Sequence, residues 1–308
     1  MIYTVTLNPA RDRSIVINDF AAGKVNRVLE TRDDPGGKGI NVSKVIKALG
    51  GESIATGILG GESGAYIKNS LDEMDIKSDF VYTDTETRTN IKISDPKNGV
   101  TTDINQKGEI NPLDAQKVFD KLLGLVKRGD TVVIAGKLDL SKVDINKWIL
   151  ALKHAQAKVY IDTEGDALNE ALKAGPYLAK PNDKELAVLT GDKTDTSAAC
   201  VSAAKEIIKS YAVETVIVSR GAGGAVFVKK NEAYNCGGLN VREVCSVGAG
   251  DTMVAAFAYA EEAGMSFKEA CELSIAASAA AVTCPGTKSP ELKQINALLP
   301  NAKAERLY

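Results

Sequence analysis

The sequence predicts an α/β fold, in which helices cover both faces of a mostly parallel central sheet and a smaller β-sheet lies outside it. Short β-rich runs alternate with helical patterns along most of the chain, whereas residues 13–32 and 88–105 carry strand-like residues with no helix among them. The 308 residues are 44% hydrophobic and 25% charged, which is typical of a globular enzyme. Because no linker or repeat divides the chain, we expect residues 1–308 to form a single domain.

The central sheet is predicted from strand-like runs that helical stretches separate. The expected strands are residues 131–135, 158–162, 177–180 and 215–219, and the expected helices are residues 112–126, 144–155, 166–173 and 196–211. This alternation indicates right-handed βαβ units. Ligands of such sheets bind beyond the carboxyl ends of the strands, so the polar residues that follow these runs mark the expected site. They are Gly136-Lys137, Asp162-Thr163, Lys180-Pro181-Asn182 and Ser219-Arg220-Gly221.

The second sheet is predicted from alternating residues in the early part of the chain. Its expected strands are residues 14–17, 25–29, 89–93 and 100–104. We expect a small β lid formed by about residues 12–34 and 88–106, and because one of its faces needs covering, a homodimer formed through the lid. Two ordinary surface hairpins are the alternative interpretation.

Charge and composition exclude several function classes. Lys and Arg number 38 and Asp and Glu 40, so the net charge is −2 and nucleic acid is not an expected partner. The N-terminus reads as a strand rather than a signal peptide, and no run is long enough to span a bilayer, so we expect a cytoplasmic protein. Five scattered cysteines are expected to be reduced. With the single histidine, His154, on a predicted helix, neither a zinc site nor a histidine triad is expected.

The strongest motif is residues 246–256, SVGAGDTMVAA, where small residues precede an acid and an apolar helix follows. The glycines allow a close backbone approach, and the helix start offers unpaired amides and a positive dipole end. We expect an anion hole at Gly248, Ala249 and Gly250, with Asp251 accepting the proton of an attacking hydroxyl. The alternative is that Asp251 only caps the helix.

Three further motifs suit a polyhydroxyl ligand, a hydrated Mg²⁺ and a nucleotide, respectively, although each has an ordinary structural alternative. Residues 34–42, DPGGKGINV, place glycines, Lys38 and Asn41 at a helix start, and they are not a Walker A loop. Asn182 and Glu185 lie three apart and fit either a hydrated Mg²⁺ or a capping box, of which local sequence favours the box. Residues 219–226, SRGAGGAV, fit a hairpin loop against a nucleotide or a plain glycine turn, and they lack the last glycine of the dinucleotide fingerprint.

The order and spacing of these motifs resemble the ribokinase-like PfkB sugar-kinase family over essentially the whole chain. Residues 36–50 and 246–256 are similar to its two signatures, residues 182–185 to its Asn-x-x-Glu motif, and residues 219–224 to its nucleotide loop. Thr6-Leu7-Asn8-Pro9-Ala10 with Asp12, together with residues 87–90 and 102–105, resembles the branch of 1-phosphofructokinases and tagatose-6-phosphate kinases. The resemblance implies a ribokinase-like αβα sandwich with a β lid, usually a dimer clasp.

The resemblance also implies ATP and Mg²⁺ as cofactors and a role for each matching residue. Asp251 is the implied base, with Gly248, Ala249 and Gly250 as the anion hole. The implied nucleotide residues are Lys180, Asn182, Ser219, Gly221 and Gly224, and Asn182 and Glu185 are expected to hold Mg²⁺ through water. The implied sugar residues are Asp12, Gly37, Lys38, Asn41, Arg88 and Asn90, of which Arg88 meets the phosphate that the sugar already carries. The expected reaction is ATP-dependent phosphorylation of fructose 1-phosphate to fructose 1,6-bisphosphate.

Four positions depart from the family pattern. Lys137 replaces a serine that often touches the sugar phosphate and is a candidate for the same contact with a full charge. Arg11 stands where an apolar residue is common, Arg220 replaces a leucine, and Glu164 replaces a small residue. These changes bear on the sugar more than on the reaction. Tagatose 6-phosphate or fructose 6-phosphate as substrate, or a non-catalytic sugar-phosphate-binding relative, are the alternatives.

Overall fold

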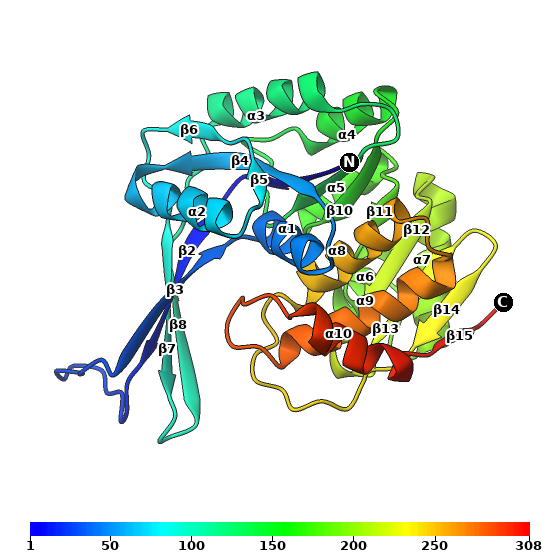
Figure 1. Ribbon diagram of the computed structural model, residues 1–308. Coiled ribbons are helices and arrows are strands. Elements are labelled where there is room, and N and C mark those ends of the chain that lie inside the picture. Colours follow the sequence, from blue (N-terminus) through cyan, green and yellow to red (C-terminus); the bar gives the residue numbers. More distant parts are fainter.

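A large, mostly parallel sheet forms the centre of the computed structural model, which describes residues 1–308 (Figure 1). Its strands lie in the order β15-β14-β13-β12-β11-β10-β9-β1-β4-β5, and β6 pairs with β4. Their bounds are β1 Ile2–Thr6, β4 Ser53–Gly60, β5 Lys77–Ser78, β6 Val81–Thr83, β9 Thr131–Ala135, β10 Lys158–Asp162, β11 Leu178–Ala179, β12 Thr215–Ser219, β13 Ala225–Lys229, β14 Ala233–Cys236 and β15 Ala304–Arg306. Strands β13 to β15 are antiparallel, so the expectation of a mostly parallel sheet is confirmed.

Helices cover both faces of this sheet, and their apolar sides form two large cores and a smaller third one. The helices are α1 Lys38–Ala48, α2 Gly61–Glu73, α3 Pro112–Leu125, α4 Ile145–His154, α5 Asp166–Lys173, α6 Asp183–Thr190, α7 Ser197–Tyr211, α8 Ala249–Glu262, α9 Phe267–Val282 and α10 Leu292–Leu298. Helices α3 to α7 bury one large core against the sheet, and α1, α8, α9 and α10 bury the other. This αβα sandwich is the predicted fold, because strands that are buried on both faces need apolar helices on both sides.

The helix starts follow the capping residues of the sequence. Asn111 accepts from the amide of Leu113 at the start of α3, and Asp144 accepts from Lys147 at the start of α4. Thr196 caps α7 through the amide of Ala199. The four helices expected between the strands begin and end within one residue of their predicted bounds. Side-chain caps fix three of the four starts, while α5 begins after Gly165 without such a cap.

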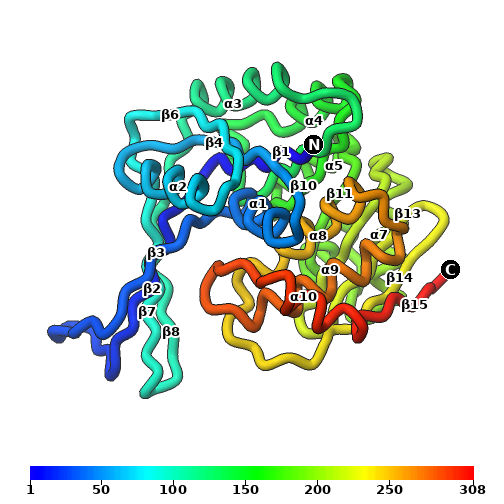
Figure 2. The backbone as a smooth tube through the Cα atoms, viewed as in Figure 1, coloured from blue at the N-terminus to red at the C-terminus, as the bar shows by residue number.

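A separate four-stranded sheet extends from the body, as Figure 2 shows for the chain trace. Its order is β3-β2-β7-β8, with β2 Ala10–Val16, β3 Glu30–Gly36, β7 Thr89–Asp95 and β8 Val100–Asn105. The expected strand at residues 25–29 is wrong, since β3 begins only at Glu30. Residues 30–36 are rich in acidic residues and end in Pro-Gly, so their strand depends on pairing with β2, from Ala10↔Gly36 to Val16↔Glu30, which local propensity does not reveal.

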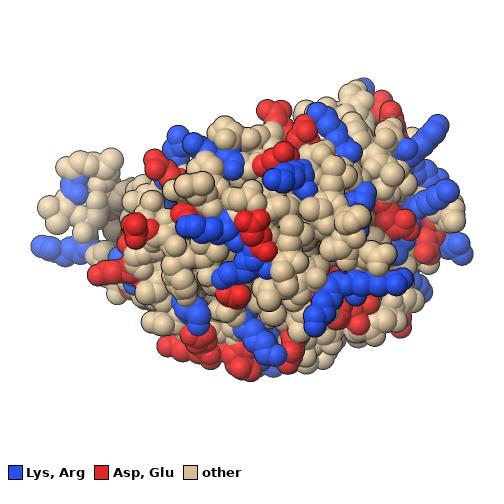
Figure 3. Space-filling model, turned by 90° about the horizontal axis from the view of Figure 1, so that it is seen from above, with Lys and Arg blue, Asp and Glu red and all other residues tan.

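Charges of both signs are mixed over the face seen in Figure 3, and no large patch of one sign is visible there. No helix is long and apolar enough to cross a bilayer. His154 is exposed at the end of α4. All five cysteines are free thiols, as expected, and four of them are buried.

Candidate active site

Asp251 lies in the first turn of α8, at the carboxyl-end edge of the sheet. The helix begins after Gly248, which takes the left-handed conformation (φ 84°) that favours glycine, and no side chain caps it. Asp251 therefore does not act as the helix cap. Its side chain is only 5% exposed, and its Oδ2 accepts a 2.8 Å hydrogen bond from Asn41 Nδ2 of α1. The carboxylate thus points away from its own helix toward the second predicted motif.

Burial raises the pKa of Asp251 from the ordinary value of 3.8 to about 6. The negative charge of Asp162 raises this pKa as well, whereas Lys38, the Asn41 hydrogen bond and Lys180 oppose the rise. A carboxylate with a pKa near 6 is mostly ionised at neutral pH and still accepts a proton readily, which is the property that a general base requires. Asn41 leaves its Oδ1 buried and without a partner.

The loop before α8 separates two cavities. Val247 contributes to the wall of a cavity of about 300 Å³ beneath the small sheet, and Ala249 and Gly250 contribute to the wall of a cavity of about 400 Å³ on the other side. Asp251 follows directly in the chain. The loop and its acid therefore stand between two spaces of a size that suits small ligands.

The larger cavity contains four of the five expected nucleotide residues, and Lys180 is not among the residues that line it. Asn182, Ser219, Gly221 and Gly224 line it, and a β-bridge joins Asn182 to Ser219, which brings the two motifs side by side. The hairpin loop of residues 219–226 is confirmed, with β12 and β13 antiparallel around it. The rest of the wall is apolar and includes Leu239, Val241, Met253, Ile275 and Val282. An apolar wall beside a glycine loop suits the base and the phosphates of a nucleotide, respectively.

Positive charge gathers where the larger cavity meets α8. Lys180 Nζ lies 3.1 Å from Asp162 Oδ1, and a side chain placed on Gly250 would bring its Cβ within 3.2 Å of the same nitrogen. The backbone amides of Gly250 and Asp251 lie in the first turn of α8. Amides in a first turn have no hydrogen-bond acceptor within their own helix. Backbone amides, a helix dipole and a lysine ammonium therefore converge on one point and favour an anion there.

The smaller cavity contains Asp12, Arg88 and Asn90. Asn90 Nδ2 donates to Asp12 Oδ1 at 2.9 Å. Gly36 leaves space for this carboxylate, since a Cβ there would lie 2.1 Å from Asp12 Oδ2. Burial raises the pKa of Asp12, while the Asn90 bond and the charges of Lys44 and Arg88 work against the rise. A carboxylate beside an amide is a suitable set of partners for sugar hydroxyls.

The expected cluster of cations around a sugar phosphate is only partly assembled. Arg88 reaches the smaller cavity, and its guanidinium donates to the backbone carbonyls of Asn8, Pro9 and Gln106 at 3.2–3.3 Å. Lys38 instead lies 3.5 Å from Asp162. Lys137 has a side chain that is 83% exposed and lies 3.8 Å from Glu164. Lys38 and Lys137 are not among the residues that line the smaller cavity.

Asn182 and Glu185 form a capping box at the start of α6. Asn182 Oδ1 accepts from the amide of Glu185, and Glu185 Oε2 accepts from the amide of Asn182, both at 2.8 Å. No group of three or more His, Cys, Asp and Glu side chains is arranged to hold a metal ion. The free oxygen of Glu185 fits Mg²⁺ only as one ligand among waters and phosphates, which is how Mg²⁺ is commonly bound in nucleotide sites.

Two charged residues of the site were given no specific role by the sequence reasoning, which named Asp162 only among the polar residues at the strand ends. Asp162 ends β10 and lies between Lys38 and Lys180, with its Oδ2 buried and unpaired; its place after a buried strand was the available signal. Lys44 is 5% exposed and donates to the carbonyls of Pro35 at 3.0 Å and Thr287 at 2.8 Å. Burial lowers the pKa of the Lys44 ammonium to about 8. Its place on an otherwise ordinary helix face gives no local signal.

The chain is similar to known proteins over nearly its whole length. Residues 5–294 match the pfkB family of carbohydrate kinases. The 1-phosphofructokinase of Borreliella burgdorferi is 35% identical, with 100% of this chain and 99% of that protein covered. Phosphofructokinase-2 from Escherichia coli superposes with a TM-score of 0.91 at 27% identity, covering 97% of this chain and 98% of the other. Ribokinase from Thermotoga maritima, 22% identical, covers 98% and 99% of the two chains with a TM-score of 0.77 and shares the fold. The expected ribokinase-like fold is confirmed.

Proposed function

Because the chain belongs to the pfkB family of carbohydrate kinases, we propose that it transfers the γ-phosphoryl group of ATP to fructose 1-phosphate and so forms fructose 1,6-bisphosphate. The supporting observation is the loop of residues 247–250, which lies between two cavities and leads directly to a buried carboxylate with a raised pKa. Phosphoryl transfer needs this arrangement, since the attacking hydroxyl and the phosphate must meet in line beside a proton acceptor.

Asp251 is the proposed general base. Its Oδ1 and Oδ2 lie beside the loop, and Asn41 holds Oδ2 by the hydrogen bond already described. The carboxylate takes the proton of the attacking hydroxyl as the new O–P bond forms. The amides of Gly248, Ala249 and Gly250 and the Lys180 ammonium stabilise the negative charge on the equatorial oxygens of the moving phosphoryl group.

The larger cavity is the proposed ATP site, with Asn182, Ser219, Gly221 and Gly224 at its polar end. Asn182 and Glu185 are proposed to hold Mg²⁺ through water. The metal would supply positive charge to the β- and γ-phosphates. Because both side chains also cap α6, a bound ion would keep a fixed position relative to the start of that helix.

The smaller cavity is the proposed sugar site. Asp12 and Asn90 line it and offer acceptors and donors for hydroxyl groups. Asn41 lines an adjoining small pocket that shares Val247 and Thr287 with this cavity, and Gly37 and Lys38 lie at the start of α1 beside Asn41. Arg88 is proposed to bind the phosphate that the sugar already carries, because a guanidinium matches phosphate geometry. Lys137, exposed at the end of β9, is proposed to add a second positive charge once the sugar phosphate is bound.

A coupled assay of ADP release tests the proposal with fructose 1-phosphate, fructose 6-phosphate, tagatose 6-phosphate and free fructose. We expect the highest kcat/KM with fructose 1-phosphate and the lowest with free fructose, because Arg88 would have no phosphate to bind. A preference for one of the 6-phosphates would contradict the substrate assignment, and no sugar-dependent ADP release at all would indicate a non-catalytic relative.

The pH dependence follows from the raised pKa of Asp251. A general base works only when it is ionised, so kcat/KM for the sugar is expected to fall about tenfold for each pH unit below about 6. An ordinary aspartate, with a pKa near 3.8, would leave kcat/KM flat at pH 5. Initial rates between pH 4.5 and 8 in buffers of constant ionic strength measure the midpoint, and a flat profile down to pH 5 would argue against Asp251 as the base.

The small sheet is proposed to act as a lid over the sugar site and as the contact of a homodimer. Its strands and loops expose the large apolar side chains Val25, Val28, Leu29, Val100 and Ile104. Such side chains on an extended sheet favour burial against a second copy. A monomeric mass in sedimentation equilibrium would count against the dimer. We further propose that the enzyme acts in the cytoplasm, which its five free thiols support.

A further inference from the structure

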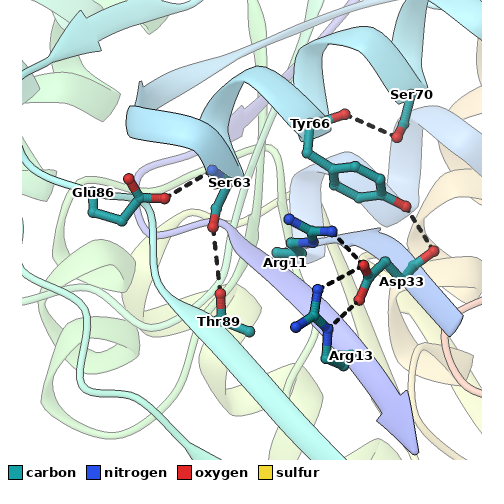
Figure 4. A network of polar contacts seen from close by, with 8 residues as sticks. All are labelled: Arg11, Arg13, Asp33, Ser63, Tyr66, Ser70, Glu86 and Thr89. Carbon is teal, nitrogen blue, oxygen red and sulfur yellow. Dashed lines mark hydrogen bonds and ion pairs between the residues drawn. The ribbon is translucent and has the colours of Figure 1, made fainter. Parts of the chain in front are cut away.

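A network of polar contacts joins the root of the small sheet to helix α2 (Figure 4). Arg13 donates to both oxygens of Asp33, from Nε to Oδ1 at 2.8 Å and from Nη2 to Oδ2 at 3.0 Å. Arg11 Nη2 donates to Oδ2 of the same carboxylate. These bonds lower the pKa of Asp33, and the bonds from Arg13 have the largest effect. Asp33 therefore remains ionised at neutral pH. One carboxylate on β3 therefore holds two guanidinium groups on β2.

Tyr66 connects this cluster to the body of the protein. Its hydroxyl donates to the backbone carbonyl of Asp33 at 2.7 Å, and its ring centroid lies 4.4 Å from Arg11 Cζ. A cation that lies over an aromatic face is attracted by the ring quadrupole. Tyr66 belongs to α2, where Ser70 donates to its carbonyl at 2.9 Å. We call Arg11, Arg13, Asp33 and Tyr66 the Asp33 brace.

The start of α2 is also bonded to the segment that enters β7. Glu86 accepts from the amides of Glu62 at 3.0 Å and Ser63 at 2.7 Å, and the hydroxyls of Ser63 and Thr89 lie 3.4 Å apart. The amide bonds, chiefly that of Ser63, lower the pKa of Glu86. Helix α2 is thus fixed to β2, β3 and β7 close to the points where these strands leave the body.

The opposite face of the same strands carries the sugar-site carboxylates. Successive residues of a strand point to opposite faces, so Asp12 lies on the face opposite Arg11, while Arg13 also contributes to the wall of the smaller cavity. In the register of β2 with β3, Arg13 pairs with Asp33 and Asp12 pairs with Asp34, and both Asp12 and Asp34 line the smaller cavity. A rotation of β2 that loosens the brace on one face therefore moves Asp12 on the other.

Stability alone does not favour an arginine at position 11. Its Nε is buried without a hydrogen-bond partner, and an unpaired buried donor costs free energy that an apolar side chain would not lose. The side chains of Arg11 and Asp33 are only 24% and 16% exposed, so their pair is less screened by water than a surface ion pair.

We propose that Arg11 and Asp33 are positioning residues that fix Asp12 for sugar binding, and that they thereby set the affinity for the sugar phosphate without affecting ATP. This inference rests on the proposed role of Asp12 in the sugar site. Arg11, Asp33 and Tyr66 are not among the residues that line the smaller cavity, whereas Arg13 contributes to its wall. No residue of the brace lines the larger cavity, which is why its effect is expected on one substrate only.

The test is a double-mutant cycle of Arg11→Leu and Asp33→Asn, with KM measured for both substrates. Arg11→Leu is expected to raise the sugar-phosphate KM about threefold, and Asp33→Asn about tenfold, because the latter leaves two guanidinium groups facing each other. The double variant is expected to be no worse than Asp33→Asn, since it removes one of the repelling charges. Arg11→Lys is expected to restore most of the affinity, and KM for ATP to change less than about twofold throughout.

The matched control is Lys97→Leu, which removes the ion pair of Lys97 with Asp19 at the turn that joins β7 to β8. It is expected to leave both KM values unchanged. A lower melting temperature of the brace variants with an unchanged sugar KM would overturn the inference, as would equal rises in both KM values. Asp12→Asn distinguishes a failure of the proposed sugar site from a failure of the proposed positioning role. If it leaves the sugar KM unchanged, the proposed sugar site itself is wrong; if it raises that KM while the brace variants do not, only the positioning role is wrong.

Discussion

Asp251→Asn is expected to lower kcat by about 10³-fold. Asparagine keeps the size of the side chain and an oxygen that accepts from Asn41, so the loop and both cavities should keep their shape. It cannot take a proton, and the attacking hydroxyl then loses its acceptor. ATP binding, measured by isothermal titration in the absence of sugar, is expected to change little because the cavity wall at Ala249 and Gly250 is intact.

The control is Asp166→Asn, which changes an exposed acid in the first turn of α5. It should turn over at the wild-type rate, which shows that a helix-start aspartate is not generally required. Turnover of Asp251→Asn within about tenfold of wild type would refute the role of Asp251 as base, since general-base catalysis contributes at least about a hundredfold.

The same substitution is expected to stabilise the fold at neutral pH. The pKa of Asp251 is higher in the folded protein, about 6, than its ordinary value of 3.8. The folded state therefore binds the proton more tightly, and this contribution to stability is present below pH 3.8 and is lost as the pH rises through 6. An uncharged asparagine avoids that loss, so the melting temperature of the variant should exceed that of wild type at pH 7 and approach it near pH 4. An inactive but more stable variant excludes misfolding as the cause of inactivity.

Asp162→Asn is expected to destabilise the protein by about 3 kcal/mol. Asp162 is 2% exposed and holds the ammonium groups of Lys180 and Lys38. Burial raises the pKa of Asp162, but the charges of both lysines outweigh this and lower it. An asparagine leaves the buried Lys180 ammonium without its carboxylate, which is the costly way to break a buried pair. Chemical denaturation at pH 7 measures the loss.

The same variant should shift the acid limb of the pH–rate profile to lower pH. The charge of Asp162 raises the pKa of Asp251, whereas Lys38 and Lys180 lower it. Removing the carboxylate ends one of the two effects that raise this pKa, so that burial alone opposes the two lysines, and the midpoint is expected about one pH unit lower. Glu170→Gln, which breaks the exposed pair with Lys173, serves as control and should cost less than about 0.5 kcal/mol. An unchanged midpoint in Asp162→Asn would show that Asp162 is not coupled to the base.

Most of the fold was predictable because its elements carry local signals. Buried parallel strands such as residues 131–135 are short apolar runs, and capping residues such as Asn111 and Thr196 fix helix starts by bonds to their own backbone. The strand at residues 30–36 was not predictable in this way. It contains three acids and a proline and exists because β2 supplies its partner. A β-strand is stabilised by its neighbours, so its own residues are a weak guide.

In the candidate site, too, the motifs were predictable from local sequence, whereas the contacts between them were not. Residues 246–251 were recognised as a loop and helix start from their glycines alone. Only the structure shows that Asp251 does not cap that helix and instead accepts a hydrogen bond from Asn41, which lies 210 residues away in the chain. Asn182 and Glu185 were assigned to a capping box from their spacing, and the structure contains it.

The sequence by itself determined the αβα layering, the glycine-lined start of α8 and the residue types that phosphoryl transfer needs, because these depend on periodicity and on short-range backbone geometry. Only the tertiary structure decided that Asp162 lies between two lysines and raises the pKa of Asp251, that Lys38 and Lys137 lie outside the smaller cavity, and that Arg11 and Asp33 brace Asp12 from behind. Electrostatic coupling acts through space over a few ångströms, and no pattern along one chain specifies which distant charges come that close.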